Sequence, residues 1–237
     1  MTWAATILTI QPEMFPGPLG ISLCGKALSE QKWSLQLRDI REHSTNRYGS
    51  VDDTPAGGGP GMVMRADIMA SAIDAVERNQ RPLILLSPRG QPFTQARARD
   101  LAQVNGAVFI CGRFEGVDQR VIEARQLEEI SIGDYVLSGG ELATMIIIDA
   151  VVRLLPGVVG ANASLDEESF EQGLLEYPHY TRPQIWEGRE IPDTLTSGHH
   201  KNIRDWRHEQ SLELTKSRRP DLWDAYQRRI GQASTKH

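Results

Sequence analysis

Three short segments of this 237-residue chain combine glycine with polar or charged side chains, and each follows an apolar run. They cover residues 85–90, 111–118 and 132–141. Glycine lets the backbone approach a ligand closely. One such segment predicts only a turn, but three in one chain favour a shared ligand pocket. A fourth segment, residues 57–62, lacks the spacing of a dinucleotide-binding loop and the Lys-Ser/Thr of a phosphate loop. It is interpreted as either a flexible loop or a ligand loop.

The sequence does not favour nucleophilic or metal chemistry. Ser138 does not lie in a G-x-S-x-G turn, and His208-Glu209 has no second histidine at zinc-protease spacing. The pair His199-His200 has no cysteine or carboxylate cluster beside it, so these residues are predicted to face solvent or RNA. No metal ligands are predicted from the residues.

Two groups of charged residues lie outside these segments. Asp149 and Arg153 are four residues apart, which puts them on one face of a helix. They could form a surface ion pair, but the surrounding apolar residues favour an interface or a site. Asp166, Glu167 and Glu168 form an acidic run that solvation alone would explain, and spacing does not select one of them as a base.

Alternating strands and helices predict an α/β fold with a mostly parallel sheet. Apolar runs bounded by glycine and proline predict strands at 5–10, 35–40, 82–86, 107–111 and 129–131. Helices are expected at 18–30, 66–79, 94–104, 117–124 and 141–154, with Thr94 and Asp118 as N-caps. In such folds ligands bind at the carboxyl ends of the strands. The three glycine segments should therefore meet at that edge.

Composition and charge suggest two domains. The sequence predicts a ligand-binding domain at 1–160, a polar linker at 161–173 and a helical domain at 174–237, with helices at 202–216 and 220–231. The net charge is −5, but residues 189–237 carry ten Lys and Arg against seven Asp and Glu. A local basic surface can attract phosphate even on an acidic chain.

The start of the chain and its apolar runs predict neither a signal peptide nor a membrane span. Cys24 and Cys111 are predicted to be buried, reduced thiols. A cytoplasmic protein is expected.

Four motifs in this order, GGGPGM, CGRFEGVDQRV, SIGDYVLSGGE and YPHYTRP, resemble those of the bacterial tRNA (guanine-N1)-methyltransferases of the SPOUT class. The resemblance extends from Ile7 to about Arg219. It implies a SPOUT-type α/β domain with a deep trefoil knot, a small C-terminal helical domain, and a homodimer with the active site at the subunit interface. True knots are rare in proteins, and no periodicity predicts one.

The resemblance also implies S-adenosylmethionine as methyl donor and the tRNA anticodon stem-loop as partner, with the methyl group moving to N1 of the guanosine 3′ of the anticodon. Mg²⁺ is implied as a further cofactor. The residues implied to bind the donor are Leu86, Ser87, Pro88, Gly112, Glu115, Ile132, Gly133, Asp134, Tyr135, Val136, Leu137, Gly139 and Gly140.

The implied catalytic residues are Glu168, as general base, and Arg153, as the cation that assists it. The resemblance implies an aspartate at the position of Glu168. Either Glu168 or Asp166 is therefore the candidate base. Tyr177, His179, Tyr180 and Arg182 are interpreted either as RNA contacts or as packing of an ordered loop. The alternative functions are a SPOUT enzyme with another RNA target and a non-catalytic RNA-binding protein.

Overall fold

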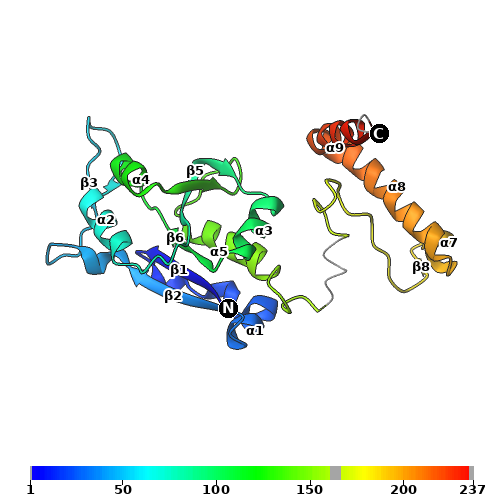
Figure 1. Ribbon diagram of the computed structural model, residues 1–237, viewed down its shortest axis with the longest axis horizontal. Helices are drawn as coiled ribbons and strands as arrows, with labels where there is room; N and C mark the ends of the chain where they lie inside the picture. Colours follow the sequence, from blue (N-terminus) through cyan, green and yellow to red (C-terminus); the bar gives the residue numbers. More distant parts are fainter. Residues whose placement is uncertain (1, 161–166, 235–237) are drawn as a thin grey trace. The chain divides into compact units, whose positions relative to one another are not determined.

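The computed structural model describes residues 2–160 and 167–234, with side chains to residue 232 (Figure 1). The chain divides into two compact units, Met1–Gly160 and Ala161–His237.

The first unit is built on a five-stranded parallel sheet in the order β2-β1-β6-β5-β7. Its strands are β1 (Trp3–Thr9), β2 (Trp33–Asp39), β5 (Leu83–Pro92), β6 (Gly106–Ile110) and β7 (Glu128–Ser131). The prediction of an α/β fold with a parallel sheet is confirmed. All five expected strands are present, with ends shifted by a few residues.

The sheet is buried on both faces because side chains alternate between two apolar clusters. Along β6, Phe109 belongs to one cluster, and Val108 and Ile110 belong to the other. The first cluster includes residues of α1 (Ser22–Ser29), α3 (Gln95–Gln103) and α5 (Glu141–Val152). The second includes residues of α2 (Ala66–Asp74) and α4 (Gln119–Arg125). Helices therefore cover both faces of the sheet (Figure 1).

Both expected N-caps are present. The side chain of Thr94 accepts a hydrogen bond from the Arg97 amide, and that of Asp118 accepts one from the Arg120 amide. Each cap satisfies an amide that the first helical turn leaves without a partner.

Two predicted helices are shorter than expected. The helix predicted at 18–30 is interrupted, because Ile21 is extended between a 3-10 turn (Gly17–Gly20) and α1. The turn folds so tightly on α1 that a Cβ at Gly25 would lie 2.2 Å from the carbonyl oxygen of Gly20. The helix predicted at 66–79 ends at Asp74. Asn79 and Gln80 adopt the left-handed backbone conformation, which is incompatible with a right-handed helix.

Short elements that the sequence pattern did not reveal complete the first unit. The strands β3 (Asp52–Asp53) and β4 (Val63–Met64) form an antiparallel pair that flanks the GGGPGM segment. A 3-10 turn, Pro12–Met14, follows β1, and another, Ile40–His43, follows β2. Two-residue strands carry too little alternation to be recognised from sequence.

The second unit contains two long helices, α8 (His200–Arg218) and α9 (Pro220–Ser234), at the positions expected. A short helix, α7 (Asp193–Thr196), and a small hairpin of β8 (Ile185–Trp186) and β9 (Arg189–Glu190) precede them. In the part of the chain that the structure describes, no helix has the length and apolar character needed to cross a membrane.

Candidate functional site

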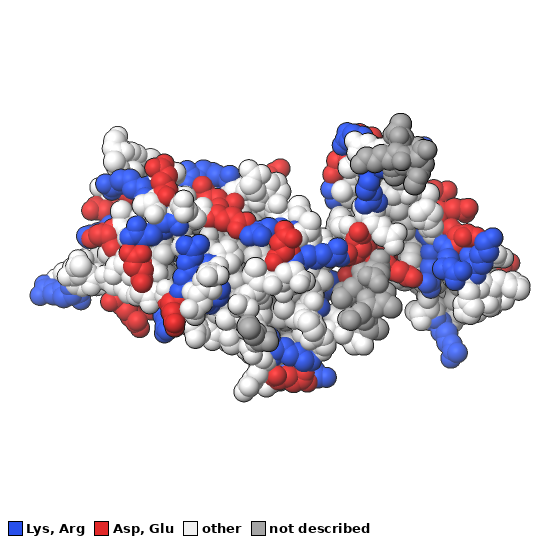
Figure 2. All heavy atoms as spheres, viewed as in Figure 1, with Lys and Arg blue, Asp and Glu red and all other residues white. Residues whose placement is uncertain are grey.

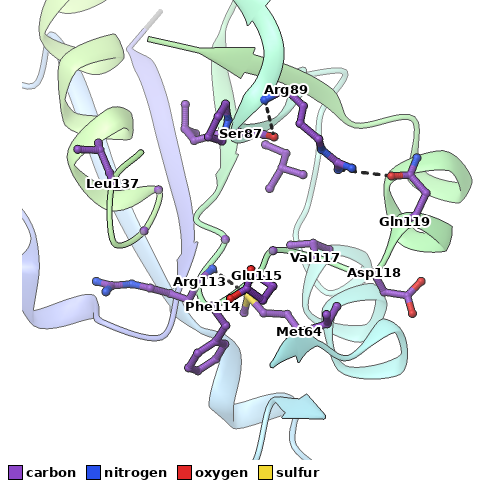
Figure 3. A pocket seen from close by; sticks show the side chains of 18 of the residues that line it. Met64, Ser87, Arg89, Arg113, Phe114, Glu115, Val117, Asp118, Gln119 and Leu137 are labelled. Atoms are coloured by element: carbon purple, nitrogen blue, oxygen red, sulfur yellow. Dashed lines mark hydrogen bonds between the residues drawn. The ribbon is translucent and has the colours of Figure 1, made fainter. Parts of the chain in front are cut away.

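The segment that bulges from β5 and the segments that follow β6 and β7 line one pocket of about 1350 Å³. Figure 3 shows Ser87, Val117 and Leu137 around its open space, while the ring of Phe114 points away from it. Small-molecule sites commonly measure about 300–1,000 Å³. This pocket therefore has room for a ligand of that size and for part of a second reactant.

An irregularity in β5 opens the first of these segments. Leu86 and Gln91 both pair with Ile130, so residues 87–90 leave the ladder and the strand then resumes. A Cβ at Gly90 would lie 2.4 Å from the backbone of Glu129, so only glycine fits where the strand rejoins the ladder. The bulge turns Ser87 and its neighbours toward the pocket (Figure 3).

The second and third segments pair with each other. The amide of Gly140 donates to the carbonyl of Gly112 at 3.0 Å, and Arg113 forms an antiparallel bridge with Gly139. A Cβ at Gly140 would lie 2.9 Å from the Cα of Cys111, so the two backbones meet where a side chain cannot fit. Gly112 is different, because its Cβ would meet Leu85 and Val117 at an ordinary 3.7 Å.

A buried carboxylate holds this junction together. Glu141, the first residue of α5, is 1% exposed and accepts hydrogen bonds from Thr9 Oγ1 at 2.7 Å and from Arg113 Nε at 3.1 Å. The positive end of the helix dipole also stabilises its charge. A buried charge needs such partners, and removing one of them is costly. Glu141 thus fixes the second and third segments to β1.

The GGGPGM segment lies against the pocket. The Glu115 amide donates to the carbonyl of Met62 at 2.9 Å, and the Met64 amide donates to the carbonyl of Gly116 at 2.9 Å. A Cβ at Gly61 would lie 2.3 Å from the Glu115 carboxylate. Gly61 therefore lets this segment pack on Glu115, and residues 53–56 and 63–67 line the pocket beside it.

The structure brings together the residues that the resemblance implied as donor-binding. Every residue implied to bind the donor lines the pocket except Asp134, which is exposed on the same segment. Of residues 57–62, Gly61 and Met62 contact Glu115, while Gly57, Gly58 and Gly59 are exposed, so both interpretations of this segment stay open. The roles of Arg113 and Glu141 were missed. A carboxylate at the first residue of an otherwise apolar helix was the available signal.

The two catalytic candidates belong to different units. Arg153 follows α5 in the first unit and is half-buried, and its amide donates to the carbonyl of Asp149 at 3.2 Å. Glu168 is half-buried in the second unit, where its carbonyl accepts from the Glu171 amide. Asp166, the other candidate base, lies outside the described residues.

The remaining titratable candidates do not form a nucleophilic or metal centre. Both cysteines are buried and free, as the sequence predicted. Burial raises the pKa of the Cys111 thiol, and burial together with Asp149 raises the pKa of Cys24 to about 12. Within residues 2–160 and 167–234, His, Cys, Asp and Glu side chains form no group of three that could hold a metal ion.

The fold is that of an α/β protein with a pocket at the carboxyl ends of its parallel strands, where ligands bind in open α/β sheets. Residues 3–225 match the model of the tRNA (guanine-1)-methyltransferase family, TrmD. A tRNA (guanine-N(1)-)-methyltransferase of Nitrobacter winogradskyi is 64% identical over 226 residues, 95% of each chain. The enzyme of the same name from Brucella ovis is 62% identical over 230 residues, 96% of this chain and 95% of its own. The chain belongs to the tRNA (guanine-1)-methyltransferase family.

Proposed function

We propose that this protein transfers a methyl group from S-adenosylmethionine to N1 of the guanosine 3′ of the anticodon in tRNA. The observation that carries this function is the match to tRNA (guanine-N(1)-)-methyltransferases at 62–64% identity over nearly the whole chain. The chain is thus an enzyme, a methyltransferase that acts on tRNA.

The large pocket of the first unit is the proposed donor site. Its lining combines apolar side chains, such as Leu86 and Leu137, with glycine backbone at Gly112 and Gly133. An adenine ring needs an apolar slot and backbone hydrogen bonds, which this lining offers. The proposed donor-binding residues are those that the resemblance implied. Asp134 is the one among them that does not line the pocket.

Methyl transfer to N1 requires the loss of a proton, because N1 of guanine is protonated and a poor nucleophile. When bound, S-adenosylmethionine supplies an electrophilic methyl group on its sulfonium sulfur. In this proposal the carboxylate of Glu168 takes the N1 proton as the new N–C bond forms. Arg153 stabilises the negative charge that develops on O6. Asp166 is the alternative base.

The two units have different proposed roles. Residues 1–160 hold the donor, with the chain knotted around residues 112–140, and residues 174–237 bind tRNA, with 161–173 as the linker. The pairing of Gly140 with Gly112 brings the third segment back against the second. Figure 2 shows Lys and Arg side chains gathered over the start of α8, beside acidic ones. Lys201 and Arg204, in the first turns of α8, are exposed, and so is Arg189 of β9.

The proposed active site is completed by a second subunit. On α5, Leu142 is 49% exposed and Ile146 is 48% exposed, and Asp149 and Arg153 follow on the same stripe of the helix. Exposed apolar side chains in a row are typical of a protein interface. A homodimer formed through this stripe would place Arg153 at the boundary between subunits.

The test is methyl transfer from labelled S-adenosylmethionine to tRNA transcripts. A transcript with guanosine 3′ of the anticodon should accept one methyl group, and nuclease digestion should identify it as N1-methylguanosine. The matched transcript with adenosine at that position should accept none. Equal labelling of both would indicate another RNA target, and no labelling with intact RNA binding would indicate a non-catalytic RNA-binding protein.

A further inference from the structure

The segment that carries Glu168 is held in a tight turn within the second unit. The amide of Phe170 donates to the carbonyl of Leu174 at 2.8 Å, and the Glu176 amide donates to Ser169 Oγ at 3.0 Å. The Leu175 amide donates to Oγ1 of Thr215, a fully buried residue of α8, at 2.8 Å. The turn after Glu168 is thus tied to α8.

The residue before Glu168 is tied to the same helix by a charged cluster. Tyr177 donates its hydroxyl to Glu167 Oε2 at 2.5 Å, and Nη1 of Arg207, on α8, lies 3.3 Å from the same oxygen. The guanidinium of Arg207 also covers the ring of Tyr177, 4.7 Å from its centre. His179 packs against Tyr177 at 5.0 Å and pairs with Glu176. The carboxylate of Glu167 therefore has two fixed donors.

This arrangement supports the interpretation of Tyr177 as packing of an ordered loop. Its hydroxyl is engaged by Glu167, and its ring is covered by Arg207 and meets His179. Burial, and next the hydrogen bond to Glu167, raise the pKa of Tyr177 to about 12. The phenol therefore stays protonated and keeps donating at any pH at which the enzyme would be assayed.

We infer that Tyr177 and Arg207 are positioning residues, which hold the carboxylate of Glu167 and so fix the backbone that carries Glu168. The inference rests on the proposed function, in which Glu168 is the base. Adjacent Cα atoms are only about 3.8 Å apart, so a fixed Glu167 restricts where the Glu168 carboxylate can reach. A base displaced by about 1 Å can lose about 10²-fold in rate. Neither Tyr177 nor Arg207 needs to touch the guanine in this role.

The experiment compares Tyr177→Phe with wild type in the full-length protein. The substitution removes the hydroxyl and keeps the ring under Arg207. We expect kcat to fall roughly 10-fold at saturating donor and tRNA, with both KM values within about twofold of wild type. Tyr48→Phe is the matched control, because Tyr48 also lies beneath an arginine, Arg47, but in the first unit and outside the turn that carries Glu168. Its kcat should be unchanged.

A double-mutant cycle separates this inference from the proposed function. In a Glu168→Gln background, single-turnover rates should show no further loss from Tyr177→Phe. The glutamine cannot accept the proton, so its position no longer affects the rate. The same loss in both backgrounds, or no loss in wild type, would overturn the positioning role. A Glu168→Gln enzyme with wild-type turnover would instead overturn the assignment of the base.

Substitutions of Glu167 give a second route should Tyr177→Phe unfold the protein. Glu167→Ala removes the shared acceptor and should lower kcat as Tyr177→Phe does. Glu167→Gln keeps an acceptor oxygen and should restore most of the lost rate. Equal activity of the two Glu167 variants would contradict the inference.

Discussion

Glu168 has the most demanding proposed role, because a general base acts only if its carboxylate can accept a proton at the reacting atom. Glu168→Gln keeps the shape of the side chain and removes that ability. Turnover should drop by roughly 10²–10⁴, with donor and tRNA binding nearly unchanged. Asp166→Asn should have a much smaller effect. Glu168→Gln at near wild-type turnover, together with an inactive Asp166→Asn, would transfer the role to Asp166.

The length of the side chain at position 168 is a second variable at this scale. Glu168→Asp introduces the residue that the resemblance implied at this position, and it withdraws the carboxylate by about one C–C bond, ~1.5 Å. If Tyr177 and Arg207 hold the turn in place, the shorter side chain cannot compensate, and the variant should be slower than wild type. Similar rates would mean that the turn moves with the substrate.

Glu141 is important for stability, because its buried carboxylate joins Thr9 and Arg113. Glu141→Ala leaves the guanidinium of Arg113 without this partner. The free energy of unfolding should fall by about 3 kcal/mol, since breaking a buried ion pair costs several times more than losing a surface one. Urea unfolding measures the change, and Glu123→Ala on the exposed side of α4 is the control, with little expected effect. Equal stability of the two variants would exclude a structural role for the Glu141 pair.

At the scale of elements, the glycines of the pocket differ in what a larger side chain would disturb. At Gly140 a side chain would meet the backbone of Cys111, so Gly140→Val should also weaken the fold. At Gly112 the nearest atoms are 3.7 Å away, so Gly112→Val should fold and fill part of the pocket. Calorimetry should show loss of S-adenosylmethionine binding by Gly112→Val, with the circular dichroism spectrum of wild type. Normal donor affinity in that folded variant would exclude the proposed donor site.

The sequence predicted the elements that depend on residues close together along the chain. Strands β1, β5 and β6 carry apolar runs long enough to recognise, and Thr94 and Asp118 mark helix starts by side-chain chemistry. The strand order and the bulge at Leu86 depend on contacts between distant segments, so no pattern along the chain encodes them. The pairing of β3 with β4 was missed for the same reason.

The features of the candidate site also differ in whether they depend on neighbouring or on distant residues. The glycine segments were found because three of them occur in one chain, each beside an apolar run, whereas one alone would predict only a turn. The ion pair of Arg113 with Glu141 spans 28 residues, and the cluster of Tyr177, Arg207 and Glu167 spans 40. Only the folded chain brings such residues together. The identification of a base among the acidic residues near 168 came from resemblance and not from spacing.

At the scale of the whole molecule, the two units should bind different reactants. A chain truncated after Gly160 should still bind S-adenosylmethionine if it remains dimeric, because the pocket lies within that unit. It should lose tRNA binding. For the full-length protein, tRNA affinity should fall as salt is added, since contacts between basic side chains and phosphates release counterions. Titration of labelled tRNA at several salt concentrations measures this, and salt-independent affinity would contradict the proposed role of the second unit.

A shared active site makes a distinct prediction about mixed dimers. Arg153 follows the exposed stripe of α5, and Glu168 belongs to the other unit, so the two can come from different subunits. Neither Glu168→Ala nor Arg153→Ala alone should be active.

After subunit exchange between these two variants, a mixed dimer would contain one site with both residues intact and one site with neither. Activity should then return to about one quarter of wild type, since about half of the exchanged dimers are mixed and half of their sites are intact. Differently tagged subunits verify the exchange. If exchange is complete and no activity returns, both residues act within one subunit, because then every site in the mixed dimer lacks one of them.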